Sequence, residues 1–334
     1  MSAKTARHTE PQWQQAADAI AAATSILLVS HIAPDGDAVG SLLGLADPLR
    51  DQGKIVTAAI DDGVPPELKF IPRSDIVAST VAAGEFDLMI SLDSSDLERI
   101  GQAGAYGMAH CRQVINLDHH PTNTRYGDIH LIVPEAVAAV EIVYDFLAHL
   151  GWRISPTAAH ALLTGLVTDT QGFRISATNS RTLEIAQDLM SKGAPLSQIM
   201  AQTLNRRSFK EVELWKLALP SVRLKDGLIY AAIRQCDLRQ VGLRKPGDGG
   251  LVSYLVTVDQ AKISIVFKEL PERKVEVGFR AKPGYDVASL AFQLGGGGHT
   301  LASGCTIDGD LQQVEAKVLP LAHQAIAEGA GSLE

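Results

Sequence analysis

The chain has 334 residues, which is about two domains at the usual size of roughly 100–200 residues each. Hydrophobic residues make up 46 % of it and can fill two cores. The formal charge of −8 argues against long nucleic acid as a partner, because phosphate contacts dominate such binding and favour basic proteins. The charge does not exclude a local basic pocket that binds a few nucleotides. Apolar runs fall well short of the roughly 20 residues of a membrane span, so no membrane partner is expected.

Residues 1–11 are polar and lack the apolar segment of a signal peptide, which predicts a cytoplasmic protein. The three cysteines, Cys111, Cys236 and Cys305, lie far apart and form no C-x-x-C pair. This spacing argues against a disulfide framework or a thiolate zinc site. Cys305 is expected to be a small core residue.

Short apolar runs alternate with helical patterns in the first half of the chain. The predicted strands are 25–30, 55–60, 88–92 and 114–117, and the first helical patterns are 41–50 and 134–150. This alternation predicts a mostly parallel sheet with helices on both faces.

Proline and capping residues set the expected helix ends. Pro48 is predicted to end or kink the first helix, because proline lacks the backbone N–H and clashes with the preceding turn. Ser155 followed by Pro156 is typical of a helix start, and this helix is expected to reach about Thr168. A further helix is predicted to begin near Asn179.

The second half of the chain has a different pattern. Residues 196–219 are predicted to be a helical connector, and β-rich runs begin at 223. A helix is expected over 286–294, followed by a four-glycine loop at Gly295–Gly298. The predicted fold class is therefore α/β, with an N-terminal mostly parallel sheet flanked by helices and a smaller C-terminal α/β domain with a Gly-rich loop. The N-terminal domain is expected to span residues 14–203 and the C-terminal domain residues 223–330. A helical linker over 204–222 is expected to join them.

Acidic and imidazole side chains follow the predicted strands or end a helix. In chain order they are His31, Asp35 and Asp37 after 25–30, Asp93 after 88–92, Asp118, His119 and His120 after 114–117, and Asp169 at the end of the helix that starts at Pro156. Ligands of open α/β sheets bind where the carboxyl ends of the strands meet. We therefore expect most of these side chains to converge.

So many carboxylates in one place would repel one another unless cations neutralised them. Mixed carboxylate and imidazole ligands suit Mn²⁺, Mg²⁺, Fe²⁺, Co²⁺ or Zn²⁺. Two such ions about 3.5–4 Å apart form a common hydrolytic centre. Each motif alone has a simpler interpretation: Asp35 and Asp37 in a turn, Asp93 in a helix cap, and Asp169 as an exposed helix end.

Taken together and in order, these motifs resemble the four motifs of the DHH phosphoesterase superfamily. The segment Gly295–Gly304 resembles the signature of the DHH-associated second domain, so the resemblance covers about residues 14–325. The segments 118–123 and 165–174 are most similar to the nano-RNase/pAp phosphatase branch. The resemblance implies a catalytic metal-binding domain followed by a substrate-binding domain.

The resemblance also implies roles for single residues. His31 and Asp35 are expected to hold one metal, and Asp37, His119 and Asp169 the other. Asp93 is expected to bridge both metals, Asp118 to orient a histidine, and His120 to face the substrate phosphate or the leaving group. The expected substrate-binding residues of the second domain are Arg280, Gly296, Gly297, Gly298, His299 and Ser303.

The implied activity is hydrolysis of very short RNAs to mononucleotides and of 3′-phosphoadenosine 5′-phosphate (pAp) to AMP. Two divalent ions are expected, Mn²⁺ first, with Mg²⁺ or Co²⁺ as alternatives. Short RNA and small nucleotides are the expected partners, and the resemblance leaves a homodimer open. Two other functions also stay open: a phosphodiesterase for cyclic or linear signalling dinucleotides, and a non-catalytic nucleotide-binding regulatory module.

Overall fold

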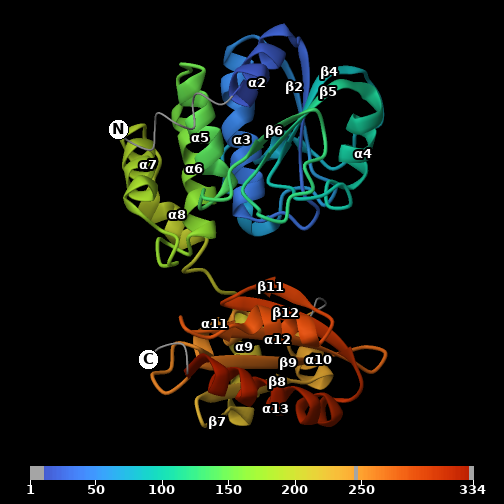
Figure 1. Ribbon diagram of the computed structural model, residues 1–334, viewed down its shortest axis with the longest axis vertical. Helices are drawn as coiled ribbons and strands as arrows, with labels where there is room; N and C mark the ends of the chain where they lie inside the picture. Colours follow the sequence, from blue (N-terminus) through green and yellow to red (C-terminus); the bar gives the residue numbers. More distant parts are fainter. Residues whose placement is uncertain (1–10, 244–246, 331–334) are drawn as a thin grey trace. The chain divides into compact units, whose positions relative to one another are not determined.

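The computed structural model describes residues 11–243 and 247–330 (Figure 1). It divides into two compact units, and the division lies between Arg206 and Arg207. The polar residues 1–10, on which the cytoplasmic expectation rests, lie outside the described residues. Within the described ranges, every helix is too short or too polar to cross a membrane.

Unit 1 contains a six-stranded sheet in the order β3-β2-β1-β4-β5-β6. All neighbouring strands are parallel, which confirms the predicted sheet type. The strands are β1 Ser25–Ser30, β2 Ile55–Ala59, β3 Val77–Ala78, β4 Phe86–Leu92, β5 Cys111–Asp118 and β6 Ile129–Ile132.

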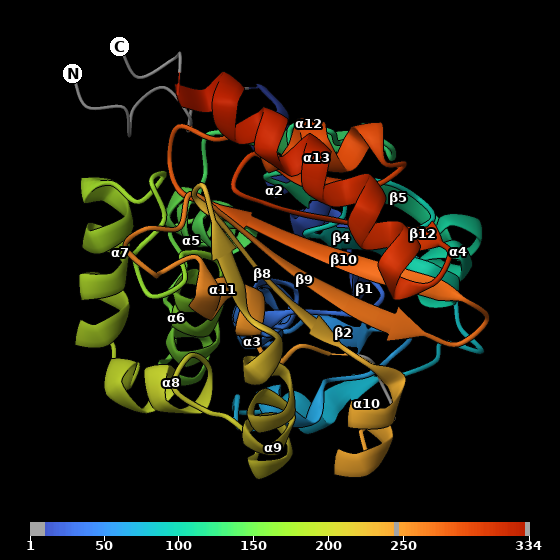
Figure 2. The same ribbon diagram turned by 90° about the horizontal axis from the view of Figure 1, so that it is seen from below.

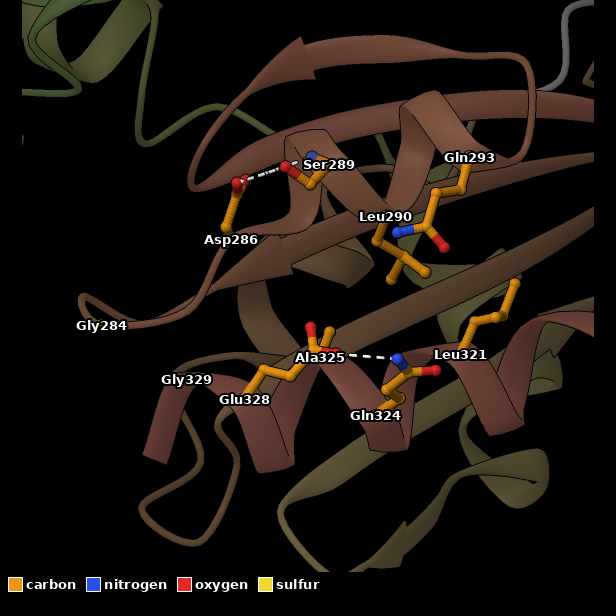
Figure 3. A pocket seen from close by; sticks show the side chains of 10 residues that line it. All are labelled: Gly284, Asp286, Ser289, Leu290, Gln293, Leu321, Gln324, Ala325, Glu328 and Gly329. Carbon is orange, nitrogen blue, oxygen red and sulfur yellow. Dashed lines mark hydrogen bonds between the residues drawn. The ribbon is translucent and has the colours of Figure 1, made fainter. Parts of the chain in front are cut away.

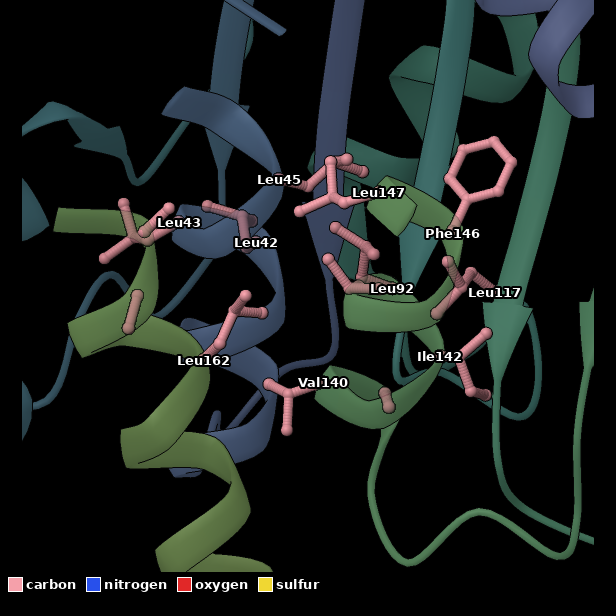
Figure 4. Packing of buried hydrophobic residues seen from close by; sticks show 14 of the residues in the cluster. Leu42, Leu43, Leu45, Leu92, Leu117, Val140, Ile142, Phe146, Leu147 and Leu162 are labelled. Carbon is pink, nitrogen blue, oxygen red and sulfur yellow. The ribbon is translucent and has the colours of Figure 1, made fainter. Parts of the chain in front are cut away.

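Helices cover both faces of this sheet. They are α2 Pro11–Ala22, α3 Gly36–Asp51, α4 Gly101–His110, α5 Ala139–His149, α6 Pro156–Asp169, α7 Ser180–Ser191 and α8 Leu196–Gln202. Alternate residues of β1 bury on opposite faces: Ile26 and Leu28 pack with α2, α3 and α5, and Leu27 and Val29 pack on the side of α4. Figure 4 shows Leu147 of α5 beside Leu92 of β4, and Phe146 and Ile142 of α5 beside Leu117 of β5.

Glycines on α3 allow a close approach to α6. A Cβ added at Gly40 would lie 2.6 Å from the carbonyl oxygen of Ala161, and one added at Gly36 would lie 2.3 Å from Thr168 Oγ1. The two helices therefore pack closer than a larger residue would permit. This contact brings the first turn of α3, with Asp37, to the last turn of α6, with Asp169.

Pro48 was predicted to end or kink its helix, but α3 runs through Pro48 to Asp51, so the predicted helix end is wrong, while the kink stays a prediction. Proline removes only one hydrogen bond near the last turn, and the buried residues on both sides of it keep the segment packed. The N–H of Gln52 closes the helix by donating to the carbonyl groups of the last turn. The helix also begins earlier than predicted, at Gly36.

Unit 2 contains a second six-stranded sheet in the order β11-β12-β10-β9-β8-β7, in which only β8 and β9 pair in parallel among the described strands. The strands are β7 Arg223–Lys225, β8 Leu228–Ile233, β9 Ile263–Leu270, β10 Lys274–Ala281, β11 Gly297–His299 and β12 Ala302–Asp308. The helices are α9 Phe209–Ala218, α10 Gln235–Val241, α11 Leu251–Leu255, α12 Val287–Gln293 and α13 Leu311–Ala330. Helices α12 and α13 cover one face, and α9 and α11 pack on the other (Figure 2).

The expected connector over 196–219 consists of two separate helices, α8 and α9. A capping box between Ser208 and Glu211 starts α9. Leu214 and Ala218 of α9 pack against Ile229 in the core of unit 2, so this helix belongs to unit 2 although it lies in the expected linker. The exact domain bounds stay a prediction.

The four glycines are not entirely a loop. Gly297 and Gly298 form the start of β11 and pair with Gly304 and Ser303 of β12. At Gly298, φ is +139° and an added Cβ would lie 2.6 Å from the carbonyl oxygen of Ala302. Only glycine fits this close strand pairing.

Candidate metal centre

The carboxyl ends of three neighbouring strands carry most of the predicted site residues. His31 follows β1, Asp93 follows β4, and Asp118 is the last residue of β5. The start of α3 adds Asp35 and Asp37, and the end of α6 adds Asp169. The convergence expected from a parallel sheet is therefore observed.

Helix starts fix the two aspartates of the first motif. Asp35 is the N-cap of α3, and its Oδ1 accepts hydrogen bonds of 3.0 Å from the N–H groups of Asp37 and Ala38. The buried Asp37 carboxylate accepts from the N–H groups of Ala139 at 2.5 Å and Val140 at 3.0 Å, in the first turn of α5. The dipole of α5 favours a negative charge there.

Short distances divide the predicted metal ligands into two groups. His31 Nε2 lies 3.4 Å from Asp93 Oδ2 and 3.9 Å from Asp35 Oδ1. The second histidine contacts the remaining carboxylates: His119 Nε2 lies 3.6 Å from Asp93 Oδ1, 3.5 Å from Asp169 Oδ2 and 3.9 Å from Asp37 Oδ2. In each group, one atom from each residue lies within 4.8 Å of the others, as metal ligands must; the groups are His31, Asp35 and Asp93, and Asp37, His119 and Asp169.

Asp93 lies between the two groups. Its backbone is in the left-handed region, with φ of +55°, and its N–H donates to the carbonyl oxygen of Leu117 at 2.9 Å. The side chain is buried, and its Oδ1 accepts no hydrogen bond from the residues that the structure describes. An unsatisfied buried carboxylate oxygen is costly, so this position fits a bound cation.

The electrostatics of the centre also fit a divalent metal. Burial, followed by the charge of Asp35, raises the pKa of Asp37 to about 7. Burial and then neighbouring carboxylates raise the pKa values of Asp93 and Asp169 well above their usual range. Burial lowers the pKa of His119 to about 4, so its imidazole is neutral near pH 7 and offers a lone pair.

Asp118 and Asn123 hold His120. Asp118 Oδ1 lies 2.8 Å from His120 Nδ1, and this hydrogen bond is the main cause that raises the pKa of His120. Asn123 Nδ2 donates to Asp118 Oδ2 at 2.6 Å and to the carbonyl oxygen of Ser94 at 3.2 Å. The loop that carries His120 is thereby connected to the loop that carries Asp93.

Sequence reasoning missed two polar side chains at this edge of the sheet. Asn123 lies in the segment 118–123 that carries the resemblance, but it received no role. Arg99 lies six residues after Asp93, and its Nη2 is 3.0 Å from His31 Nδ1. Burial is the main cause that lowers the pKa of His31, and the charge of Arg99 contributes to it. No spacing rule points to Arg99, because its position depends on the path of an irregular loop.

The predicted substrate residues of unit 2 lie around β10, β11 and β12. Arg280 lines a cavity of about 370 Å³ together with Lys268 and Glu276, and its buried Nε has no partner among the described residues. His299 ends β11, opposite Ala302 of β12. These positions are compatible with substrate binding, which stays a prediction.

Ser303 lines the same cavity as Arg280. Its buried hydroxyl donates to the carbonyl oxygen of Val287 at 2.5 Å, so the structure gives it a partner within unit 2. The Gly-rich segment packs closely at Gly296, where an added Cβ would lie 2.1 Å from the carbonyl oxygen of Gly304. The backbone of this segment is therefore fixed by its neighbours in the sheet.

A further cavity, of about 270 Å³, lies between α12 and α13 (Figure 3). Asp286 caps α12 at one end of it, and Gln324 donates to Glu328 along α13. The cavity contains none of the predicted site residues. It is therefore separate from the candidate substrate residues of this unit.

Comparisons with known proteins agree with the geometry. A family model described as "DHH family, N-terminal domain" matches residues 25–166, and one described as "DHHA1 domain" matches residues 230–328. The bifunctional oligoribonuclease and PAP phosphatase NrnA of Thermus thermophilus is 32 % identical over 303 residues, which cover 88 % of each chain. This chain belongs to the DHH family.

Two other similar proteins extend the comparison. The crystal structure of an exopolyphosphatase-related protein from Bacteroides fragilis has a TM-score of 0.85 and 25 % identity, covering 95 % of this chain and 96 % of that one. The cyclic-di-AMP phosphodiesterase GdpP of Geobacillus thermodenitrificans is 26 % identical over 301 residues. That match covers 84 % of this DHH chain but only 44 % of GdpP.

Proposed function

We propose that this DHH protein is a metal-dependent phosphoesterase that hydrolyses very short oligoribonucleotides to mononucleotides and pAp to AMP. The observation that carries the proposal is the convergence of imidazoles and carboxylates around Asp93, whose buried Oδ1 has no partner among the described residues. The substrate class is supported by the Thermus thermophilus relative, whose name states both activities and which matches over most of both chains.

In this proposal, His31 and Asp35 hold one divalent ion, Asp37, His119 and Asp169 hold the other, and Asp93 is shared. Mn²⁺ is proposed because the ligands are imidazole nitrogens and carboxylate oxygens, with Mg²⁺ and Co²⁺ as alternatives. When bound, such ions supply Lewis-acid chemistry, which offsets phosphoryl charge and makes water a nucleophile near neutral pH.

The chain's own residues then position the reaction. Asp37 is fixed by the start of α5, and Asp35 by its role as the cap of α3. Asp118 holds the Nδ1 proton of His120, so Nε2 is the atom through which His120 would pass a proton to the leaving oxygen. Arg280 and the glycine segment up to His299 would bind the nucleotide in unit 2.

The test is Mn²⁺-dependent release of mononucleotides from a labelled RNA dimer and of AMP from pAp, by the wild type and by Asp93→Ala. The proposal expects both activities in the wild type and their loss in the variant. Equal rates for the two proteins would contradict it. A length series of labelled RNAs then measures the preference for very short chains.

A dinucleotide phosphodiesterase is the second candidate, because the similarity to GdpP covers 84 % of this chain. Rates on a cyclic dinucleotide, a linear dinucleotide and pAp, measured side by side, separate it from the first. A non-catalytic nucleotide-binding module need not retain two transition metals per chain, so metal analysis of the purified protein tests that class. A cytoplasmic location and a homodimer remain parts of the proposal that sequence alone suggests.

A further inference from the structure

Arg99 lies on the segment between β4 and α4, at the same edge of the sheet as Asp93. Its carbonyl oxygen accepts a hydrogen bond of 2.8 Å from the N–H of Ile32, and its own N–H donates to Asp96 Oδ1 at 3.0 Å. Both the backbone N–H and the backbone C=O of Arg99 are therefore fixed, the latter by the residue after His31. The position of this arginine beside the metal centre follows from the backbone and does not depend on a flexible loop tip.

The guanidinium of Arg99 has no carboxylate partner among the ion pairs of the described residues. Other arginines of unit 1 do, as Arg73 pairs with Asp47 and Arg181 with Asp145. The Arg99 side chain instead approaches an imidazole, with Nη2 at 3.0 Å from His31 Nδ1, and the residue is half-buried. Its positive charge is thus not neutralised by a paired acid, and part of the side chain remains accessible.

The hydrogen-bond chemistry of His31 limits what Arg99 can do there. His31 Nε2 faces Asp93 and Asp35, while Nδ1 lies 2.8 Å from the carbonyl oxygen of Ile32. If Nε2 gives its lone pair to a cation, the ring proton is on Nδ1 and is donated to that carbonyl. His31 then has no lone pair left to accept a hydrogen bond from Arg99. The N–H groups of the Arg99 guanidinium can therefore donate to another acceptor.

An incoming phosphate ester is such an acceptor. The other ionisable groups that converge at the centre are carboxylates and histidines, so a second negative charge needs a donor besides the metals. A guanidinium presents N–H groups in a planar fork that matches phosphoryl oxygens. Resting on the proposed function, we propose that Arg99 is a catalytic residue of this centre, which binds a phosphoryl oxygen of the substrate beside the ion held by His31.

The alternative is that Arg99 only positions His31, and the two roles predict different measurements. We would compare Arg99→Gln and Arg99→Lys with the control Arg112→Gln, whose side chain is 84 % exposed at the start of β5. Titration calorimetry on each protein gives three affinities: for Mn²⁺ alone, and for AMP and adenosine with the Mn²⁺-loaded protein. AMP and adenosine differ only in the phosphate, so the ratio of their dissociation constants reports phosphate recognition.

The expected result is that Arg99→Gln lowers the preference for AMP over adenosine on the order of tenfold, while the affinity for Mn²⁺ stays within about twofold. Its kcat on the RNA dimer should fall on the order of 10²-fold, as for removal of one oxyanion donor. Arg99→Lys should keep part of the preference, since it keeps the charge but not the fork. Arg112→Gln should match the wild type in all three affinities.

An unchanged preference for AMP in Arg99→Gln would overturn the inference, whether or not the affinity for Mn²⁺ falls. That outcome leaves the proposed function intact as long as the wild type hydrolyses the RNA dimer and pAp. Inactivity of the Mn²⁺-loaded wild type on both substrates would instead overturn the proposed function, and the inference with it.

Discussion

The two units place their predicted site residues by different means. In unit 1 the strands run in parallel, so residues that follow β1, β4 and β5 share one edge, however far apart they lie in the chain. In unit 2 most neighbouring strands are antiparallel, and proximity depends on register. Arg280 and His299 lie in one row across the sheet because both pair with Ala302 of β12, from opposite sides. Strand direction alone predicts that the site residues of unit 1 converge. The arrangement of the site residues in unit 2 follows only from the observed register.

The largest loss of activity is expected for a substitution in unit 1, at Asp169. Asp169→Asn removes a carboxylate of the centre, and activity should fall on the order of 10³-fold if the metals contribute several kcal/mol. The metal-free variant should be at least as stable as the metal-free wild type, because a carboxyl whose pKa is raised by burial and by Asp37 and Asp35 destabilises the fold when ionised.

The matched control is Asp51→Asn, since Asp51 is likewise the last residue of a helix but is exposed. Initial rates and thermal unfolding in EDTA measure the two properties. Equal losses of activity in Asp169→Asn and Asp51→Asn would show that the loss comes from removing a charge at a helix end. The loss would then not come from removing a ligand of the metal centre.

Asn123→Ala tests how the loops of unit 1 hold His120. The variant leaves Asp118 without the amide donor and breaks the contact to the carbonyl of Ser94. We expect kcat to fall about 10–100-fold, as for other partners that orient active-site ligands. The exposed neighbour Thr122→Ala serves as the control. A kcat within twofold of the wild type would mean that Asp118 keeps its orientation without Asn123.

Arg280→Gln tests whether the candidate substrate residues of unit 2 contribute to substrate binding. If unit 2 contributes binding and unit 1 the chemistry, KM for pAp should rise on the order of tenfold, which equals about 1.4 kcal/mol, with kcat little changed. The affinity for Mn²⁺ should match that of the wild type. Arg223→Gln, at an exposed position of β7, is the control. A fall in kcat without a change in KM would place Arg280 in the chemical step instead.

Gly40→Ala tests the helix contact that supports the centre. The added Cβ would meet the carbonyl oxygen of Ala161 at 2.6 Å, a backbone atom that cannot rotate away. The free energy of unfolding should fall by about 1–3 kcal/mol, as for other overpacked cores. Gly247→Ala is the control, since nothing lies within 4 Å of its added Cβ. Chemical denaturation that gives the same stability for both variants would contradict the proposed close packing.

The smallest effect is expected for Ser303→Ala. Its hydroxyl donates to the carbonyl of Val287, so the variant should lose about 1 kcal/mol of stability with KM unchanged. Ser253→Ala, at an exposed position of α11, provides the reference. An increased KM at unaltered stability would instead support the substrate contact that the resemblance implies for Ser303.

Much of unit 1 could be predicted from the sequence because apolar strands alternate with helices and the motifs follow strands, except for Asp169 at the end of α6. The prediction failed where tertiary packing outweighs a local rule. Pro48 stays inside α3 because the helix is buried along most of its length. Arg99 could not be found, since it reaches His31 through an irregular segment with no periodic pattern.

Unit 2 was harder to predict in detail. Gly297 and Gly298 form a strand against the low strand propensity of glycine, because they pair with β12, and at Gly298 this close pairing permits only glycine. The hydroxyl of Ser303 donates to the carbonyl oxygen of Val287, a contact that no sequence pattern indicates, and the substrate-binding role of this residue stays a prediction. Strand register and the face of the sheet on which a side chain lies depend on tertiary packing. No sequence motif predicts either of them.

We propose that side chains between His31 and Asp169 form one dinuclear cation site around Asp93. Anomalous diffraction at the manganese edge, from crystals grown with Mn²⁺, would locate the ions. We expect two ions about 3.5–4 Å apart, one beside His31 and one beside His119, with a carboxylate oxygen of Asp93 close to both. Manganese bound elsewhere, or one ion that does not contact Asp93, would rule out this site.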